Sequence, residues 1–177
     1  MELRNVGRRF EETFTRDDGK RFKGMMYAPP ASQTRVTTFI TPRRILKVRR
    51  GTGVKEGDVF QQPNGTWGLC FDIQDGYFYE PNFNLFGVIT LDQNLTWTRK
   101  VTEIDPVTKT LRQVEPEDLG YLKCVVEYVR QEDDSLKVST AVYRLLCGKE
   151  IKEGDLIGEK HYIRKVENVL GIYLAYV

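Results

Sequence analysis

The chain has 177 residues, of which 40% are hydrophobic and 29% are charged, and its formal net charge is +2. This composition supplies enough apolar residues for a folded core and excludes a disordered chain. The apolar runs are shorter than the ~20 residues that a membrane-spanning helix needs. Met1 to Arg4 leads into charged residues rather than into the apolar core of a signal peptide. We therefore expect a soluble cytosolic protein that has no membrane partner.

The charge is distributed unevenly along the chain. Residues 1–50 carry a net charge of +8, whereas residues 51–177 carry −6. Three explanations remain open: a basic arm that touches nucleic acid, a subunit whose basic part docks on an acidic neighbour, or a fold whose two halves neutralise each other.

Enzyme chemistry has little support in the sequence. The chain lacks a glycine-rich phosphate loop, a GxSxG elbow and an HExxH motif, and His161 is its single histidine. Folding could still bring carboxylates such as Asp72 and Asp155 together. We expect no enzymatic activity, no cofactor and no metal site.

The three cysteines, Cys70, Cys124 and Cys147, have no CxxC spacing and lie among strand-like neighbours. We expect buried free thiols. A reactive thiol would have to recruit His161 as its base.

The N-terminal region predicts a β-hairpin over residues 10–27, because Asp18-Gly19 suits a tight turn and aromatic residues flank it. Pro29-Pro30 then interrupts strand pairing. A polar linker to residue 35 and a β-branched strand over residues 36–41 follow, and Pro42 ends that strand. We predict residues 1–44 to be an N-terminal hairpin and arm that is loosely attached to a main domain of residues 45–177.

Residues 43–50 form the most basic window and predict a strand anchored by Ile45, Leu46 and Val48. Its cations suit a partner-facing strand edge, non-specific contact with DNA phosphates, or a solvated edge that resists unwanted pairing. The candidate contact residues in this window are Arg43, Arg44, Arg49 and Arg50.

The middle of the chain predicts further strands. Asn64-Gly65 indicates a hairpin between residues 59–61 and 66–72, and strands are expected at 88–91 and 95–104, with another turn at Asp105-Pro106 before residues 107–114. The aromatic loop at 77–86 suits a contact surface, although core packing and a ligand pocket are alternatives. Its candidate contact residues are Tyr77, Phe78, Tyr79, Phe83 and Phe86.

The last third predicts a long hairpin of residues 121–130 and 135–146, joined by residues 131–134. Residues 115–119 resemble the first turn of a short helix, because proline and early acidic residues suit a helix N-terminus. The expected fold is mainly β, a small antiparallel β-barrel or compact sandwich with long loops, including an excursion at about 74–120.

One short motif occurs twice, at residues 54–60 and 97 residues later at 151–157. Each copy contains a Gly-Asp pair, Gly57-Asp58 or Gly154-Asp155. Glycine tolerates a positive φ, and the carboxylate can bond downstream backbone amides. We predict structural turns rather than catalytic or metal-binding aspartates.

The C-terminal pattern also suggests a family. Residues 143–148, 151–157, 162–166 and 171–175 resemble the closing strands of small β-barrel subunits in tailed-phage head–tail connectors, of the stopper or head-completion type, and the N-terminal hairpin resembles theirs as well. The resemblance implies a non-enzymatic virion structural protein, assembled in the host cytoplasm, that forms a homo-oligomeric ring around the DNA channel. Its partners would be further copies of itself and portal, adaptor or tail proteins, with non-specific DNA contact. The alternative is an SH3-like β-barrel module that binds nucleic acid through its basic N-terminal part.

Overall fold

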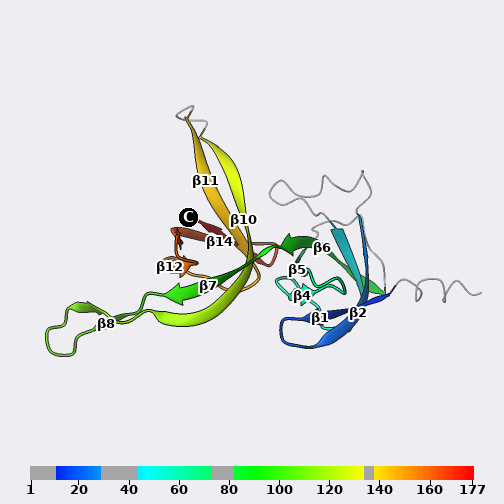
Figure 1. The fold of residues 1–177 in the computed structure, drawn as a ribbon, viewed down its shortest axis with the longest axis horizontal. Coiled ribbons are helices and arrows are strands. Elements are labelled where there is room, and N and C mark those ends of the chain that lie inside the picture. The colour runs from blue at the N-terminus through cyan, green and yellow to red at the C-terminus, as the bar shows by residue number, and fades with distance from the viewer. Residues whose placement is uncertain (1–10, 29–43, 73–81, 134–137) are drawn as a thin grey trace, which may run out of the picture. The chain divides into compact units, whose positions relative to one another are not determined.

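The computed structural model describes residues 11–28, 44–72, 82–133 and 138–177, and all regular elements in these ranges are β-strands (Figure 1). The mainly-β prediction is confirmed. The predicted helical turn at residues 115–119 is wrong, because Glu117 to Leu119 begin a long strand instead. Within the described ranges there is no helix with the length and apolarity that crossing a membrane requires.

The chain divides into two compact units. Unit 1 comprises residues 1–92 with 169–172, and unit 2 comprises residues 93–168 with 173–177. This division differs from the predicted boundary at residue 44.

Unit 1 is a closed antiparallel barrel with the strand order β1-β2-β3-β6-β5-β4, in which β4 pairs back to β1. Its strands are β1 (Glu12–Arg16), β2 (Arg21–Tyr27), β3 (Arg44–Arg49), β4 (Val59–Gln61), β5 (Trp67–Asp72) and β6 (Phe83–Leu91).

The N-terminal hairpin is an integral part of this barrel. Gly19 has a φ of 81° in the turn between β1 and β2, as the Asp-Gly signal predicts. Strand β1 pairs with β4, and β2 pairs with β3. The hairpin therefore supplies two of the six barrel strands. The predicted strand at residues 36–41 lies outside the described residues.

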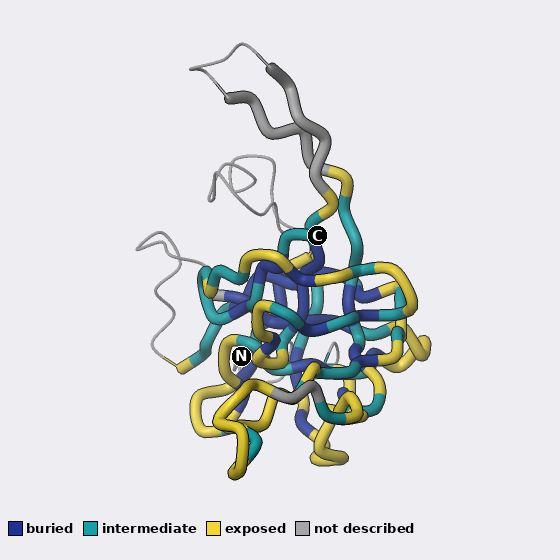
Figure 2. The backbone as a smooth tube through the Cα atoms, turned by 90° about the vertical axis from the view of Figure 1, so that its left-hand side faces the viewer, coloured by how far each residue is buried: buried dark blue, intermediate teal, exposed yellow. Residues whose placement is uncertain are grey.

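Three phenylalanines fill the centre of unit 1. The rings of Phe14 and Phe22 stack with centroids 5.3 Å apart, and the edge of Phe60 packs against both, at 5.5 and 5.9 Å. Apolar residues of β3, β5 and β6 surround these rings. Buried positions recur along the strands (Figure 2), as the alternation of side chains between the two faces of a sheet requires.

Unit 2 contains a curled sheet with the strand order β13-β12-β7-β10-β11-β15-β14 and a separate two-stranded sheet, β8-β9. Its strands are β7 (Gln93–Arg99), β8 (Thr102–Ile104), β9 (Leu111–Gln113), β10 (Glu117–Asp133), β11 (Val138–Cys147), β12 (Asp155–Ile157), β13 (His161–Tyr162), β14 (Lys165–Val169) and β15 (Ile172–Tyr176). The predicted long hairpin is confirmed as β10 and β11, although β10 runs on to Asp133.

The two units share one strand order. Read around the closed barrel from β5, unit 1 has the order β5-β4-β1-β2-β3-β6, and unit 2 has the order β13-β12-β7-β10-β11-β15. The repeated motif lies at the same point of each sheet, where it leads into β4 or β12. The short sequence repeat therefore marks two copies of one strand order, which closes into a barrel in unit 1 and forms a curled sheet with the additional edge strand β14 in unit 2.

The two copies differ in their connections. In unit 1 a short turn at residues 17–20 joins β1 to β2, whereas in unit 2 the equivalent connection, from β7 to β10, contains the β8-β9 hairpin. The β8-β9 hairpin is thus an insertion into the strand order that the two units share.

The core of unit 2 includes Trp97, Leu122, Leu145 and Ile157, which are all buried. All three cysteines are free thiols and buried, as predicted. Cys124 on β10 lies directly opposite Cys147 on β11 in the strand register, without a disulfide bond.

Candidate functional site

The two Gly-Asp turns have the same hydrogen bonds. Gly57 and Gly154 have φ values of 81° and 91°, so both occupy the region that glycine favours. One carboxylate oxygen of Asp58 accepts from the amide of Lys55 at 3.0 Å, and that of Asp155 accepts from the amide of Lys152 at 2.9 Å. The prediction of structural turns fits this geometry, but the bonded amides lie three residues upstream rather than downstream.

The surroundings of Asp155 extend this structural role. Its carboxylate is buried and accepts from Arg99 Nε at 2.7 Å, from a second Arg99 nitrogen at 2.8 Å and from Trp97 Nε1 at 2.9 Å. Burial opposes ionisation, but the hydrogen bonds from Arg99, Lys152 and Trp97 outweigh it and lower the pKa of Asp155. The carboxylate is fully engaged in holding β12 against β7.

Asp58 also has an arginine partner, from β1, which is the strand of unit 1 that corresponds to β7. Arg16, at the end of β1, lies 3.2 Å from the Asp58 carboxylate and also donates to the Gly53 carbonyl at 3.0 Å. Among the described residues, no group of three or more histidine, cysteine, aspartate or glutamate side chains is placed to hold a metal ion. The hydrogen bonds and ion pairs of Asp58 and Asp155 tie both Gly-Asp turns to neighbouring strands.

The basic window forms β3, with Ile45, Leu46 and Val48 buried as predicted. Arg44 and Arg49 are exposed, and Arg49 pairs with Glu11 at 3.0 Å. Arg50, just after the strand, is exposed as well, whereas Arg43 lies outside the described residues.

The aromatic candidates separate into different environments. Phe83 and Phe86 belong to β6 rather than to a loop. Phe86 is only 5% exposed in the core of unit 1, whereas Phe83 is half-buried with Lys47 Nζ 4.3 Å from its ring centroid. Phe86 therefore packs in the hydrophobic core of unit 1. Tyr77, Phe78 and Tyr79 lie outside the described residues.

The β8-β9 hairpin, residues 102–113, is hereafter called the arm and is distinct from the N-terminal arm predicted for residues 1–44. Figure 1 shows it extending away from the curled sheet of unit 2. Three large apolar residues on it are exposed: Ile104 by 65%, Val107 by 86% and Leu111 by 75%. Ile104 and Leu111 pair directly across the two strands, so their side chains lie on one face. We call these three side chains the arm tip.

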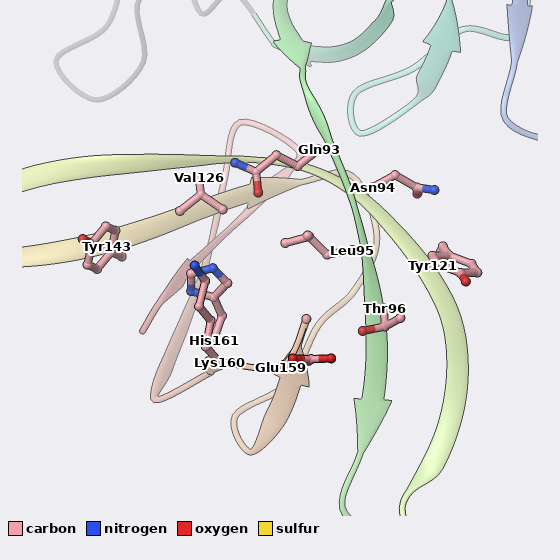
Figure 3. A pocket seen from close by; sticks show the side chains of 11 residues that line it. Gln93, Asn94, Leu95, Thr96, Tyr121, Val126, Tyr143, Glu159, Lys160 and His161 are labelled. Carbon is pink, nitrogen blue, oxygen red and sulfur yellow. The ribbon is translucent and has the colours of Figure 1, made fainter.

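Unit 2 also has an open groove with a volume of about 710 Å³ beside β7, β10, β11 and the β12-β13 turn. Leu95, Val126 and His161 face one another across it, and Tyr143 lies at one end (Figure 3). The His161 and Tyr143 ring centroids are 6.4 Å apart. Burial and the charge of Lys160 lower the pKa of His161, which keeps the imidazole neutral near pH 7. The groove therefore combines an apolar and aromatic patch, which includes Leu95 and Val126, with polar lining residues, which include Gln93, Asn94 and Thr96. Glu159 and Lys160 lie at its rim.

Sequence reasoning missed both the arm tip and the groove. The Asp105-Pro106 signal does indicate the turn of the arm, although residues 107–110 belong to this turn and β9 begins only at Leu111. Nothing in the sequence shows that Ile104 and Leu111 are exposed, because such residues in a strand are usually buried. The groove depends on long-range strand pairing.

Comparisons with protein-family models, curated proteins and solved structures give no match to this chain.

Proposed function

We propose that the chain is a non-enzymatic assembly subunit, and specifically a ring-forming head–tail connector or neck protein of a tailed-phage virion. The observation that carries this proposal is the arm, which exposes three large apolar side chains on a hairpin with few neighbours. An isolated two-stranded hairpin is marginally stable in water, and contiguous exposed apolar side chains typically mark an interaction surface. The arm is thus suited to a protein partner.

The engagement of the carboxylates supports a non-enzymatic role. Asp155 is buried in hydrogen bonds with Arg99, Trp97 and a backbone amide, and Asp58 is bonded to Arg16 and a backbone amide. A general base or nucleophile must reach a substrate. Neither aspartate is free to do so.

The alternative, nucleic-acid binding through the basic N-terminal part, depends on Arg44, Arg49 and Arg50, which are exposed on or beside β3. Ion pairs weaken this case, because Arg49 is matched by Glu11 and Arg16 is matched by Asp18 and Asp58. Binding of DNA by the monomer, weakening steeply with salt, would favour this alternative.

Light scattering after size-exclusion chromatography tests the proposed function. The full chain is expected to form oligomers of defined mass, visible as rings by negative-stain microscopy. A chain that stays monomeric at every concentration up to its solubility limit would overturn the proposal.

An armless variant sharpens the test. The amide of Val114 donates to the Val101 carbonyl at 3.1 Å, so an Asn-Gly turn can join these residues in place of 102–113. Unit 1 makes the equivalent connection with a short turn, so the variant should keep its circular dichroism spectrum and lose its oligomers.

A further inference from the structure

We infer that the arm tip of one copy docks in the groove on unit 2 of a second copy. This inference rests on the proposed function, because it names the contact through which the subunits assemble. The chain then carries both halves of one interface, a projecting arm tip and a receiving groove.

The arm tip is a pre-formed shape. The Asp105 carboxylate accepts from the amides of Val107 at 2.8 Å and Thr108 at 3.1 Å. The Asp105 amide donates to the Thr110 carbonyl, and the Lys109 amide donates to the Asp105 carbonyl, each at 2.9 Å. The bonds from the Thr108 and Val107 amides lower the pKa of Asp105 and keep it ionised. Because these hydrogen bonds restrain the turn before docking, they reduce the conformational entropy that docking costs.

The groove matches the arm tip in chemistry. Leu95 and Val126 are half-buried and pack against the core of unit 2, so part of their apolar surface remains open to a ligand. The volume of about 710 Å³ lies within the range of roughly 300–1,000 Å³ that is typical of binding pockets. The apolar patch can accept the branched side chains of the arm tip, and the polar residues Gln93, Asn94 and Thr96 beside it can bond to polar groups of the arm turn.

The charges around the two surfaces are also complementary. The arm turn carries one acid and one base, Asp105 and Lys109, and the groove rim likewise carries Glu159 and Lys160. Each charge of the turn therefore has an opposite charge available on the rim. Such pairing fixes the register of an interface more than it adds affinity.

The arm tip would reach the groove of a second copy rather than its own, because an arm is directed away from the groove of the same chain. Strand β7 contributes Leu95 and Thr96 to the groove and then continues through Arg99 towards β8. Figure 1 shows the arm leaving the curled sheet at this far end. The contact is therefore heterologous, with arm to groove on each neighbour, and repetition of such a contact produces a closed ring or an open filament.

Disulfide trapping between two different variants tests the contact. One chain carries Val107→Cys and the other carries Glu159→Cys, and the native thiols are buried. A disulfide-linked mixed dimer should form on mild oxidation. The matched control pairs Val107→Cys with Glu153→Cys, which places an exposed thiol on unit 2 outside the groove. Equal cross-linking of the control and groove positions, or no mixed dimer, would overturn the inference.

Charge placement on the arm gives a second readout. Val107→Asp should weaken self-association roughly 30-fold, as expected for losing an interface hot spot. Thr102→Asp adds the same charge near the base of the arm and should leave association within about threefold of wild type. If the wild type assembles and Val107→Asp assembles equally well, the docking inference fails while the proposed function stands. If the wild type is monomeric, the proposed function itself fails.

Discussion

Asp58 in the barrel of unit 1 and Asp155 in the curled sheet of unit 2 occupy equivalent positions in one shared strand order. The Asp58 carbonyl accepts a hydrogen bond from the amide of Cys70 on β5, and the Asp155 carbonyl accepts one from the amide of Ile163, each at 2.9 Å. Each carboxylate also forms an ion pair with an arginine of the equivalent strand, Arg16 on β1 or Arg99 on β7. The equivalence extends from the backbone to the ion pairs, although unit 2 buries its aspartate more completely.

This difference in burial predicts unequal effects of the same substitution. Asp155→Asn should lower the free energy of unfolding by about 2–4 kcal/mol, because it leaves Arg99 without its bidentate partner. Asp58→Asn should cost only about 1–2 kcal/mol, because Asp58 keeps some solvent contact and loses fewer bonds. Urea unfolding of both variants measures the two values. Equal losses would contradict the assignment.

The lowered pKa of Asp155 also predicts a pH dependence. A carboxyl group whose folded pKa lies below its unfolded value, about 3.9, stabilises the fold at higher pH, and this stability is lost as the pH falls through the folded pKa. The free energy of unfolding should therefore decline below about pH 4. In Asp155→Asn this decline should be shallower, and an identical pH profile would exclude Asp155 as its source.

Gly87 on β6 lies directly opposite Phe71 on β5. A Cβ atom on residue 87 would lie 2.2 Å from Phe71 Cζ, which is far inside van der Waals contact, and Phe71 is fully buried. Gly87→Ala should therefore destabilise the protein by about 1–3 kcal/mol. In a Phe71→Leu background the same change should cost less, because the clashing ring atoms are gone. A double-mutant cycle measures this coupling, and simple additivity would contradict it.

The cysteines should react only when the protein unfolds. Burial raises the pKa of Cys70 well above its ordinary value and raises the pKa of Cys147 to about 12. The thiolate is the reactive form, so both burial and protonation protect these residues. Alkylation at pH 8, followed by mass spectrometry, should label the denatured chain fully and the native chain slowly. Rapid native labelling would indicate that the two units open.

Charge reversal on β3 separates a partner-facing edge from a solvated one. The double variant Arg49→Glu with Arg50→Glu should change the free energy of unfolding by no more than about 1 kcal/mol, because Arg49 itself is largely exposed in its ion pair with Glu11. Assembly should weaken if these charges face a neighbour. Light scattering and thermal melting of the same sample measure both effects. Unchanged assembly would identify the window as solvated surface.

Local signals determined much of the strand pattern. Asp18-Gly19 and Asn64-Gly65 each predict a hairpin that the structure contains, because a tight turn with positive φ needs those residue types. The buried positions of Ile45, Leu46 and Val48 also follow from the sequence. The helical turn predicted at residues 115–119 failed because pairing of β10 with β7 overrides a weak local preference.

Tertiary structure alone decided which strands meet. The motif at residues 54–60 and 151–157 shows a repeat in the sequence, but the pairing of Arg99 with Asp155 depends on residues 56 positions apart. The same holds for the groove, where Leu95, Val126 and His161 converge from three strands, and for the arm, whose apolar residues are indistinguishable from core residues by type. Local sequence specifies turns and strand faces through backbone sterics and alternation, whereas exposure and partner choice depend on long-range pairing.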